Sequence, residues 1–314
     1  MTLAKQGIDV GIDVIGDVHG YADHLRALLE QMGYRESRGA YRHRNRTALF
    51  VGDLIDRGPK QIEVYRLVRA MCEAGTAQCV LGNHEFNAIG WVRTDPKTQQ
   101  PLRAHNDSHW RQHRAFLEQV GSDGSPLHVE MIDWFETLPL WVETDDIRVV
   151  HACWHDGSRR ALDNAVDAEG RLTPNGLTTA LTRGTAAYQA IDVLLKGPEV
   201  RLPDGISFVD AEGTQRRQAR VKWWSPDATT YRTAAIMGPD LAHQLPDTEL
   251  PDRRFSYSDR KPVFFGHYWL SGEPRVECSV AVCLDYSIAK DGALVAYRWS
   301  GEDHLTPENI KSVT

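Results

Sequence analysis

Residues 48–58 read ALFVGDLIDRG, an apolar run that ends at a glycine and an aspartate. A continuous apolar run of this length is typical of a strand that is buried on both faces. Residues 8–20 (IDVGIDVIGDVHG) and residues 78–85 (QCVLGNHE) repeat the arrangement. Apolar residues at helical spacing over residues 22–32 and 62–71 lie between these runs. This β-α-β-α-β order predicts an α/β fold with a largely parallel sheet covered by helices.

Further apolar runs predict additional strands at residues 147–150, 263–265, 280–284 and 294–299. We expect the last two of these strands to pair around the turn at residues 290–292. Two mixed regions interrupt the pattern, at about residues 93–124 and 154–257, the second with a helical piece near residues 177–195. We therefore expect residues 1–314 to form a single domain, in which the two regions are cap-like insertions over one face.

Composition excludes several classes of protein. The chain is 41% hydrophobic and 25% charged, which is ordinary for a globular protein, and no run of about 18 apolar residues could span a membrane. A formal net charge of −7 disfavours nucleic acid as a partner. The five cysteines show no Cys-x-x-Cys spacing, and the N-terminus lacks the layout of a signal peptide. We therefore expect reduced thiols, a cytoplasmic location and no membrane partner.

Metal-binding residue types follow five of the predicted strands at the point where each strand ends. They are Asp17 and His19, then Asp53, then Asn83 and His84, then His151, and finally His267. In open α/β sheets the functional crevice lies outside the carboxyl ends of the strands, so these side chains should meet at one edge. The set suits two divalent metals, because a carboxylate such as that of Asp53 can ligate both ions. Two metals about 3.5–4 Å apart can activate a water and stabilise attacking and leaving oxygens.

The donor types also restrict the metal. Carboxylate, imidazole and amide donors match manganese, iron or zinc better than calcium, which prefers oxygen ligands alone. We expect manganese, with iron, zinc, nickel and magnesium as alternatives.

The sequence resembles a known family in three blocks. GDVHG at residues 16–20, GDLIDRG at 52–58 and GNHE at 82–85 are similar to the signature of the calcineurin-like metallophosphoesterases. The closer resemblance is to the branch that contains Ser/Thr protein phosphatases and symmetrical diadenosine tetraphosphatases. It is clear over residues 8–90, and His151 and His267 extend it. It implies a metallophosphoesterase-type β-sandwich with flanking helices and an active site at the carboxyl ends of the strands.

The resemblance also implies a metal-ligand set. One metal would be enclosed by Asp17, His19, Asp53 and His267, with Asp53 shared, and the second would be completed by Asn83 and His151.

It further implies the roles of residues around the metals. His84 would be the general acid, Asp56 would orient it, and Arg57 would bind phosphate. Relatives use a further arginine from the insertion, for which the candidates are Arg220, Lys222 and Arg232. We take Arg232 forward, with Arg57 and Asn83, as the substrate-binding set.

The implied activity is phosphomonoester hydrolysis of the Ser/Thr protein phosphatase type, by attack of a hydroxide that bridges the two metals. The alternative is a dinucleoside polyphosphate (diadenosine tetraphosphate) hydrolase, and a phosphodiesterase or an inactive scaffold is less favoured. The partner would be a phosphorylated protein or a nucleotide, and oligomeric state is left open. Bulky Trp154, Tyr268 and Tyr286 stand where relatives have smaller residues, which leaves the choice of substrate open.

The remaining polar and aromatic residues are expected to be structural. This applies to the nine other histidines, among them His155, which we place in a loop. The Arg- and His-rich residues 93–114 are expected to be a solvated helix face, with a substrate-guiding rim as the alternative. Trp223 and Trp224 are expected in the core, in preference to a base-stacking platform.

Overall fold

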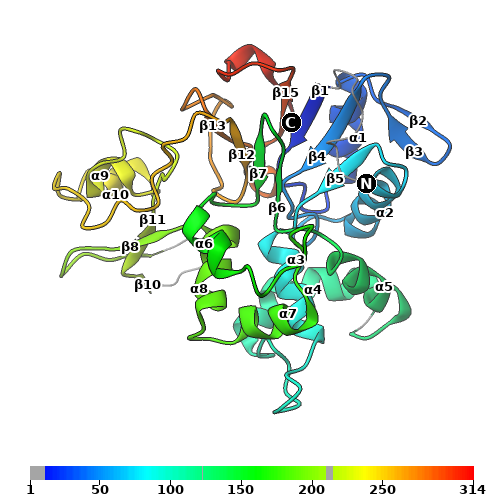
Figure 1. Cartoon of the computed structure of the whole chain (residues 1–314), viewed down its shortest axis with the longest axis horizontal. Coiled ribbons are helices and arrows are strands. Elements are labelled where there is room, and N and C mark those ends of the chain that lie inside the picture. Colours follow the sequence, from blue (N-terminus) through cyan, green and yellow to red (C-terminus); the bar gives the residue numbers. More distant parts are fainter. Residues whose placement is uncertain (1–10, 122, 210–214) are drawn as a thin grey trace.

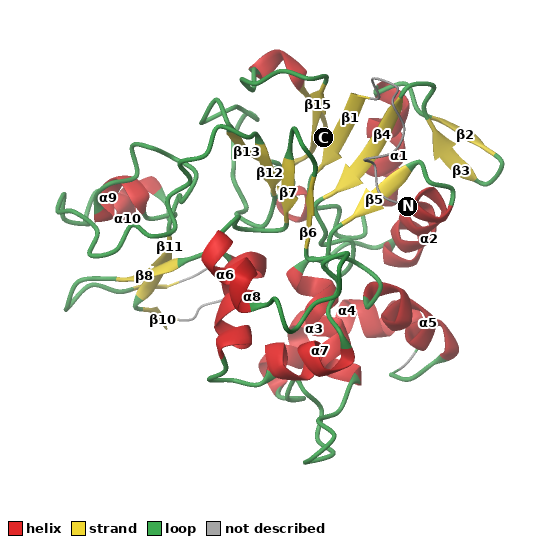
Figure 2. Ribbon diagram, in the orientation of Figure 1, coloured by secondary structure: helices red, strands yellow, loops and turns green. Residues whose placement is uncertain are grey.

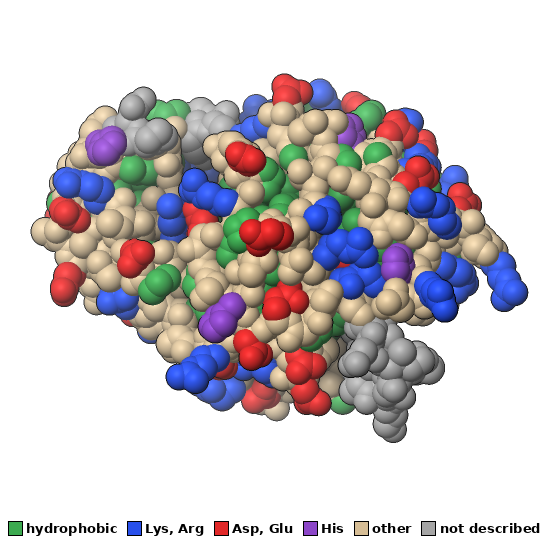
Figure 3. All heavy atoms as spheres, turned by 90° about the horizontal axis from the view of Figure 1, so that it is seen from above, with side chains coloured by type: hydrophobic (Ala, Val, Ile, Leu, Met, Phe, Trp, Pro, Cys, Tyr) green, Lys and Arg blue, Asp and Glu red, His purple; other side chains and the backbone are tan. Residues whose placement is uncertain are grey.

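A computed structural model describes residues 11–121, 123–209 and 215–314. Two β-sheets pack face to face and helices flank them, which confirms the expected α/β sandwich (Figures 1 and 2). Ile8 and Val10 of the first predicted strand lie outside the described residues. No helix in the described ranges is long and apolar enough to cross a membrane. Acidic and basic side chains are interspersed over the face shown in Figure 3.

The first sheet contains the three strands predicted at the N-terminal end. Its order is β14 (Asp285–Tyr286), β15 (Ala293–Trp299), β1 (Gly11–Ile15), β4 (Arg46–Phe50) and β5 (Ala77–Cys79), with β16 (Ile310–Val313) paired to β15. β1, β4 and β5 run parallel, whereas β15 is antiparallel to β1. The parallel part brings the ends of three strands to one edge, as the sequence predicted.

The second sheet has the order β13 (Ala281–Cys283), β12 (Val263–Phe265), β7 (Arg148–Val150) and β6 (Trp141–Glu143). The predicted pairing of residues 280–284 with residues 294–299 is wrong. β13 pairs in parallel with β12, and it is the short β14 that pairs with β15. The chain crosses between the sheets at Leu284, whose N–H donates to the Phe265 carbonyl at 2.7 Å. Because both sheets need apolar residues, the apolar run shows no sign of this crossing.

Side chains that point alternately to the two faces of each strand divide the core into layers. Ile12 and Val14 face the second sheet, where they join a cluster with Phe264 and Val282. The opposite side of β1 places Ile15 in a larger cluster with the helices. α1 (Ala22–Gln31) and α2 (Gln61–Glu73) contact the strands of the first sheet. The side-chain period of 2 in a strand explains this division.

Helices α3 to α8 gather below the carboxyl ends of the strands in Figure 1. They are α3 (Asn83–Val92), α4 (Asp107–Val120), α5 (Pro126–Phe135), α6 (Asp156–Ala161), α7 (Pro174–Leu181) and α8 (Ala186–Lys196). The helical piece predicted near residues 177–195 is therefore two helices, with Gly184 at a φ of 87° between them. Trp223 and Trp224 are buried, as expected, and His155 caps α6 by accepting from the Ser158 N–H.

Small elements complete the fold. They are the hairpin β2 (Arg35–Ser37) and β3 (Ala40–Arg42), β8 (Glu199–Arg201), β9 (Phe208–Val209), β10 (Gln215–Arg216), β11 (Gln218–Arg220), α9 (Tyr231–Ala234), α10 (Pro239–Ala242), η2 (Ile288–Lys290) and η3 (Pro307–Asn309). β8, β11, α9 and α10 lie to the left of the second sheet in Figure 1. Val200 and Val221 belong to a small apolar cluster of this part of the chain.

A buried ion-pair cluster ties three strands of the first sheet together. Asp13 on β1 is fully buried, and its Oδ1 accepts from Arg46 Nε at 2.8 Å and Arg298 Nε at 3.2 Å. Arg46 also donates to the backbone carbonyls of Ile12 and Trp299. A charge buried in this way is tolerated because its partners and hydrogen bonds surround it.

We expect Asp13→Ala to lower the free energy of unfolding by about 3 kcal/mol, because it leaves the largely buried side chain of Arg46 without its carboxylate. The measurement is urea denaturation, in which the midpoint should fall at constant m-value. Glu73→Ala, which breaks the surface pair with Arg69, is the control and should cost less than about 1 kcal/mol. A similar cost for both variants would contradict the importance of the buried cluster.

Candidate metal centre

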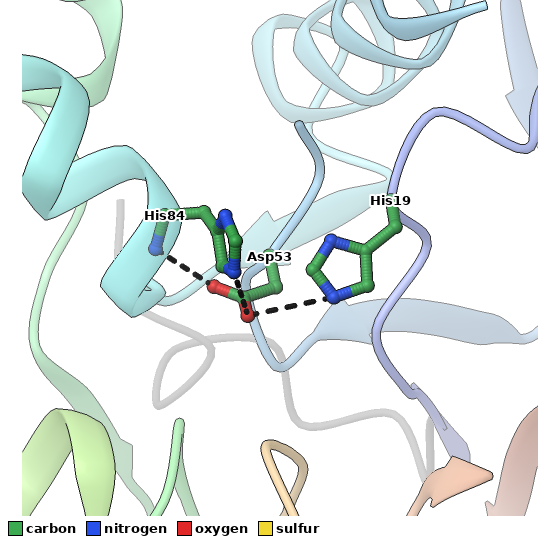
Figure 4. A group of neighbouring side chains, drawn as sticks. All are labelled: His19, Asp53 and His84. Carbon is green, nitrogen blue, oxygen red and sulfur yellow. Dashed lines mark hydrogen bonds and ion pairs between the residues drawn. The ribbon is translucent and has the colours of Figure 1, made fainter. Parts of the chain in front are cut away.

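The five strand ends named from the sequence meet at one point, and the Asp53 carboxylate lies in the middle. Its Oδ2 is 3.7 Å from Nε2 of His19 and 3.7 Å from Nε2 of His84 (Figure 4). Its Oδ1 is 3.5 Å from Nε2 of His151 and accepts from the His84 backbone N–H at 3.0 Å. A single carboxylate therefore faces three imidazoles from three different strand ends.

The other predicted ligands surround this carboxylate. Asn83 Oδ1 is 3.0 Å from Nε2 of His151, and Asp17 Oδ2 accepts from the backbone N–H of His267 at 3.0 Å. Ligand atoms of His19, Asp53 and His84 lie within 4.8 Å of one another, as do those of Asp53, His151 and His267. Asp53 belongs to both groups, which is the geometry that a shared ligand requires.

Backbone carbonyls determine which imidazole nitrogen faces the centre. Nδ1 of His19 lies 2.9 Å from the Ile55 carbonyl, and Nδ1 of His151 lies 2.7 Å from the Val51 carbonyl. A carbonyl can only accept, so each Nδ1 carries the proton and each Nε2 presents a lone pair. His151 Nε2 and Asn83 Oδ1 are then two acceptors facing each other, an arrangement that a cation would stabilise.

Unsatisfied buried atoms provide a second test of whether metals fit. Four of the predicted ligands carry side-chain atoms that are buried without a hydrogen-bond partner: Oδ1 of Asp17, Nε2 of His19, Oδ2 of Asp53, and both ring nitrogens of His267. Buried polar atoms are seldom left unsatisfied without a functional reason. The donor set and these orphaned atoms fit divalent cations.

Burial keeps the histidines ready to bind metal. It lowers the pKa of His19 to about 3, and it also lowers the pKa values of His151 and His267. Neutral imidazole is the form that ligates metal. Burial, and next the neighbouring carboxylates of Asp285 and Asp53, raises the pKa of Asp17. Negative charge is therefore concentrated at a place where a cation would relieve it.

Several of these residues have backbone conformations that are rare outside glycine. The φ angles of His19, Asp53 and His267 are 45°, 51° and 77°. Such conformations cost of order 1–3 kcal/mol each and persist only where the surroundings enforce them. The preceding glycines allow close approach: a Cβ at Gly266 would lie 1.8 Å from Asp17 Oδ1. Gly82 of the third sequence block is also crowded, because a Cβ there would lie 2.3 Å from Asp53 Oδ1.

The predicted acid, His84, has two carboxylates around it. Its Nδ1 is 2.6 Å from Asp56 Oδ2, and its Nε2 points to Asp53. Burial alone would lower the pKa of His84, but Asp53 and Asp56 outweigh burial and raise it. The pair therefore has the geometry that the family resemblance implied for an oriented, protonated imidazole.

His113 is a neighbour of this pair that the sequence did not reveal. It lies on α4 and is buried, and its Nδ1 is 3.4 Å from Asp56 Oδ1. The expectation of a solvated helix face over residues 93–114 is therefore wrong for His113. Burial alone would raise the pKa of Asp56, but His113 and His84 lower it overall. No spacing linked residue 113 to residue 56, because a long loop and the helix α4 bring them together.

Two buried acids were also missed. Glu85 accepts from the backbone N–H groups of Asp53 and Leu54, and Asp285 accepts from those of Trp269 and Ser287. Burial raises the pKa of Glu85 to about 7 and that of Asp285 to about 6. The acid at residue 85, three residues after a glycine that begins a helix, resembles a capping box and could have been recognised. Residue 285 carried no such signal.

The three arginines that could bind phosphate are placed differently relative to the metal centre. Arg57 is exposed at the rim, with its guanidinium 3.9 Å from the centroid of the Trp269 ring. Arg232 lies on α9, where it donates to the Leu245 carbonyl. Arg220 on β11 is near the centre, since after burial its charge is the largest contribution that lowers the pKa of His267. Of the insertion candidates, Arg220 is therefore better placed than Arg232.

A two-sheet sandwich with oxygen and nitrogen donors gathered at one edge is a metallophosphoesterase-type fold. Residues 11–179, more than half of the chain, match the calcineurin-like phosphoesterase family, and the chain belongs to that family. Membership implies divalent metal ions at this centre.

Curated relatives share parts or nearly all of the chain. It is 52% identical over 73 residues to the asymmetrical bis(5'-nucleosyl)-tetraphosphatase PrpE of Halalkalibacterium halodurans, which is 23% of this chain and 30% of that protein. It spans 54% to 56% of three other asymmetrical relatives. It is 27% identical over 302 residues to the symmetrical bis(5'-nucleosyl)-tetraphosphatase of Chromohalobacter salexigens, which is 93% of this chain and 96% of that protein.

Solved structures include a protein serine/threonine phosphatase from Saccharomyces cerevisiae. It has 16% sequence identity and a TM-score of 0.49, and the match covers 98% of this chain and 80% of that chain.

We expect the stability of the metal-stripped protein to depend on the neutrality of His267. Its pKa is below the unfolded value of about 6.5, so the unfolded state binds the extra proton and stability falls as the pH falls below 6.5. Between pH 6.5 and 5.5, wild type should lose about 1 kcal/mol of stability relative to His267→Asn, approaching the limiting slope of about 1.4 kcal/mol per pH unit at lower pH. Urea denaturation at pH 7.5, 6.5 and 5.5 measures this difference.

The exposed His304→Asn substitution is the control for the loss of an imidazole. If the difference between wild type and His267→Asn did not vary with pH, His267 would not be a buried neutral imidazole.

Proposed function

We propose that the chain hydrolyses phosphoanhydride bonds of dinucleoside polyphosphates. The observation that carries the proposal is similarity over 93% of the chain to a relative with that named activity. Phosphoprotein hydrolysis, the first expectation from the sequence, becomes the second candidate. It is favoured by the short contact between His84 and Asp56, because a general acid matters most for an alkoxide leaving group.

We propose the ligand set implied by the family resemblance, with His267 assigned to the second ion. One ion would be held by Asp17, His19 and Asp53. The second would be held by Asp53, Asn83, His151 and His267, because the ligand atoms of His267 lie within 4.8 Å of those of Asp53 and His151. Two divalent ions, when bound, supply Lewis-acid stabilisation of the attacked phosphate and a lowered pKa for a water. Manganese is the metal we propose, with iron, zinc, nickel and magnesium as alternatives.

The neighbouring residues would handle the proton and the phosphate. His84 would donate a proton from Nε2 to the leaving oxygen, and Asp56 would hold its Nδ1–H. His113, against the second oxygen of Asp56, would keep that carboxylate in place. Arg57 and Asn83 would bind phosphate oxygens, for which a planar guanidinium is suited. Arg220 replaces Arg232 as the proposed phosphate-binding residue of the insertion.

We also propose that the chain is a single domain with cap-like insertions at about residues 93–124 and 154–257. Contacts between insertion and core support this: the Ala152 N–H donates to the Leu194 carbonyl, and Trp223 Nε1–H donates to the Ala152 carbonyl. The five cysteines are free, which is consistent with a reducing compartment, and the cytoplasmic location stays a prediction.

The substrate is tested by assaying the purified chain with manganese on diadenosine tetraphosphate, a phosphoserine peptide and p-nitrophenyl phosphate. We expect the highest kcat/KM on the dinucleotide. Asp53→Asn is the control and should lose at least about 100-fold in kcat on every substrate, because the shared ligand is lost. A clear preference for the peptide would overturn the proposed substrate, and two bound metals with normal turnover in Asp53→Asn would overturn the shared ligand.

The acid is tested by comparing leaving groups in His84→Asn. An alkyl phosphate leaves as a strongly basic alkoxide, whereas a phosphate leaving group has a pKa of only about 6. We expect a loss of about 100-fold in kcat on an alkyl phosphate and a much smaller loss on diadenosine tetraphosphate. Metal content, measured by elemental analysis, should stay unchanged. Equal losses on both substrates would exclude His84 as the acid.

A further inference from the structure

Two positive charges lie against one tryptophan at the edge of the metal centre. The Arg57 guanidinium carbon is 3.9 Å from the centroid of the Trp269 ring, and Lys290 Nζ is 4.1 Å from the same centroid. Both distances are within the range of cation–π contacts. The ring thus places two cations, from segments far apart in the sequence, beside each other.

These residues line a surface pocket that also contains a predicted metal ligand. Its lining is His19, Arg57, Trp269, Asp285, Ser287, Ala289 and Lys290. His19 Nε2 faces Asp53 in the centre, so the pocket adjoins the metal centre at His19. The pocket is too small to enclose a phosphate, so a chain of phosphates held at the metals would pass over its surface, from His19 toward Lys290.

The two cations are available to a ligand. Throughout the described ranges, neither Arg57 nor Lys290 has a carboxylate within ion-pair distance, although many other basic residues of this acidic chain do. Asp285 lines the same pocket, but its Oδ2 accepts from the Trp269 N–H at 2.7 Å and its Oδ1 from the Ser287 N–H at 2.9 Å. Burial raises the pKa of Asp285 and the charge of Arg57 acts to lower it, so Asp285 partly offsets Arg57, whereas Lys290 has no ion-pair partner in the described part of the chain.

The pocket is built on a constrained backbone. Arg57, Trp269 and Ser287 have φ angles of 73°, 51° and 59°, in the left-handed region. The two hydrogen bonds to Asp285 join the segment that carries Trp269 to the segment that leads to Lys290. Conformations of this kind persist where the surroundings enforce them, which constrains the backbone that carries Arg57 and Trp269.

We propose that Arg57, Trp269 and Lys290 form an anion subsite for the phosphates adjoining the one that is attacked. The ligand class is a linear polyphosphate, either free or within a dinucleotide. This inference rests on the proposed function and deepens it: Lys290 selects polyphosphates over phosphomonoesters. A monoester places its single phosphate at the metals and Arg57 and does not reach Lys290, whereas a polyphosphate carries further negative charges along the pocket.

The subsite is tested by inhibition of p-nitrophenyl phosphate hydrolysis in the full-length, manganese-loaded protein. The probes are inorganic tripolyphosphate and orthophosphate. We expect Lys290→Met to raise the inhibition constant of tripolyphosphate about fivefold relative to that of orthophosphate, the effect of one exposed charge contact. Lys290→Arg, which keeps the charge, should restore most of the discrimination. Sequestration of manganese by tripolyphosphate affects all variants equally.

Lys311→Met is the matched control, because it removes one lysine charge on β16, outside the pocket lining. It should leave the ratio of the two inhibition constants at the wild-type value. An equal shift of both constants in Lys290→Met, or the same shift in Lys311→Met, would overturn the subsite.

The result separates the two proposals. If diadenosine tetraphosphate is not a substrate but Lys290→Met still weakens tripolyphosphate selectively, the proposed function fails and the subsite stands. If the dinucleotide is the preferred substrate and Lys290→Met changes neither its KM nor the inhibition ratio, the function stands and the subsite fails.

Discussion

The Asp53 carboxylate is the point on which the rest of the structure depends. It faces the imidazoles of His19, His84 and His151 within 3.7 Å, and it is almost fully buried. Its backbone carbonyl also accepts from the N–H groups of Val18 and His19. A buried carboxylate is costly unless cations or hydrogen bonds compensate it, so the surrounding strands must deliver such partners to one place. Divalent metals at this centre would complete the compensation.

The β-sandwich supplies the rigidity that this arrangement needs. The parallel strands β1, β4 and β5 end at one edge, and the second sheet brings β7 and β12 to the same edge. Strained backbone at His19, Asp53 and His267 is held between the sheets and the helices below them. The buried acids Glu85 and Asp285 accept hydrogen bonds from the backbone of the loops around the centre.

The insertions add residues around the metal centre. His113 comes from α4 and lies against Asp56. Arg220 comes from β11, and its charge helps to lower the pKa of His267. Trp269 places Arg57 beside Lys290. The metal centre therefore accounts for phosphate chemistry in general, whereas the residues around it would decide which phosphate compound binds.

The sequence by itself determined the N-terminal β-α-β-α-β order, the convergence of the strand-end residues, and the family. Apolar runs bounded by glycine and polar donors are local signals, so they can be read one segment at a time. Only the tertiary structure decided that residues 281–283 join the second sheet, that His113 meets Asp56, and that Arg57 and Lys290 share one tryptophan. Those contacts join segments that are far apart in the chain, so no local sequence pattern predicts them. The packing of the two sheets and the insertions determines which segments meet.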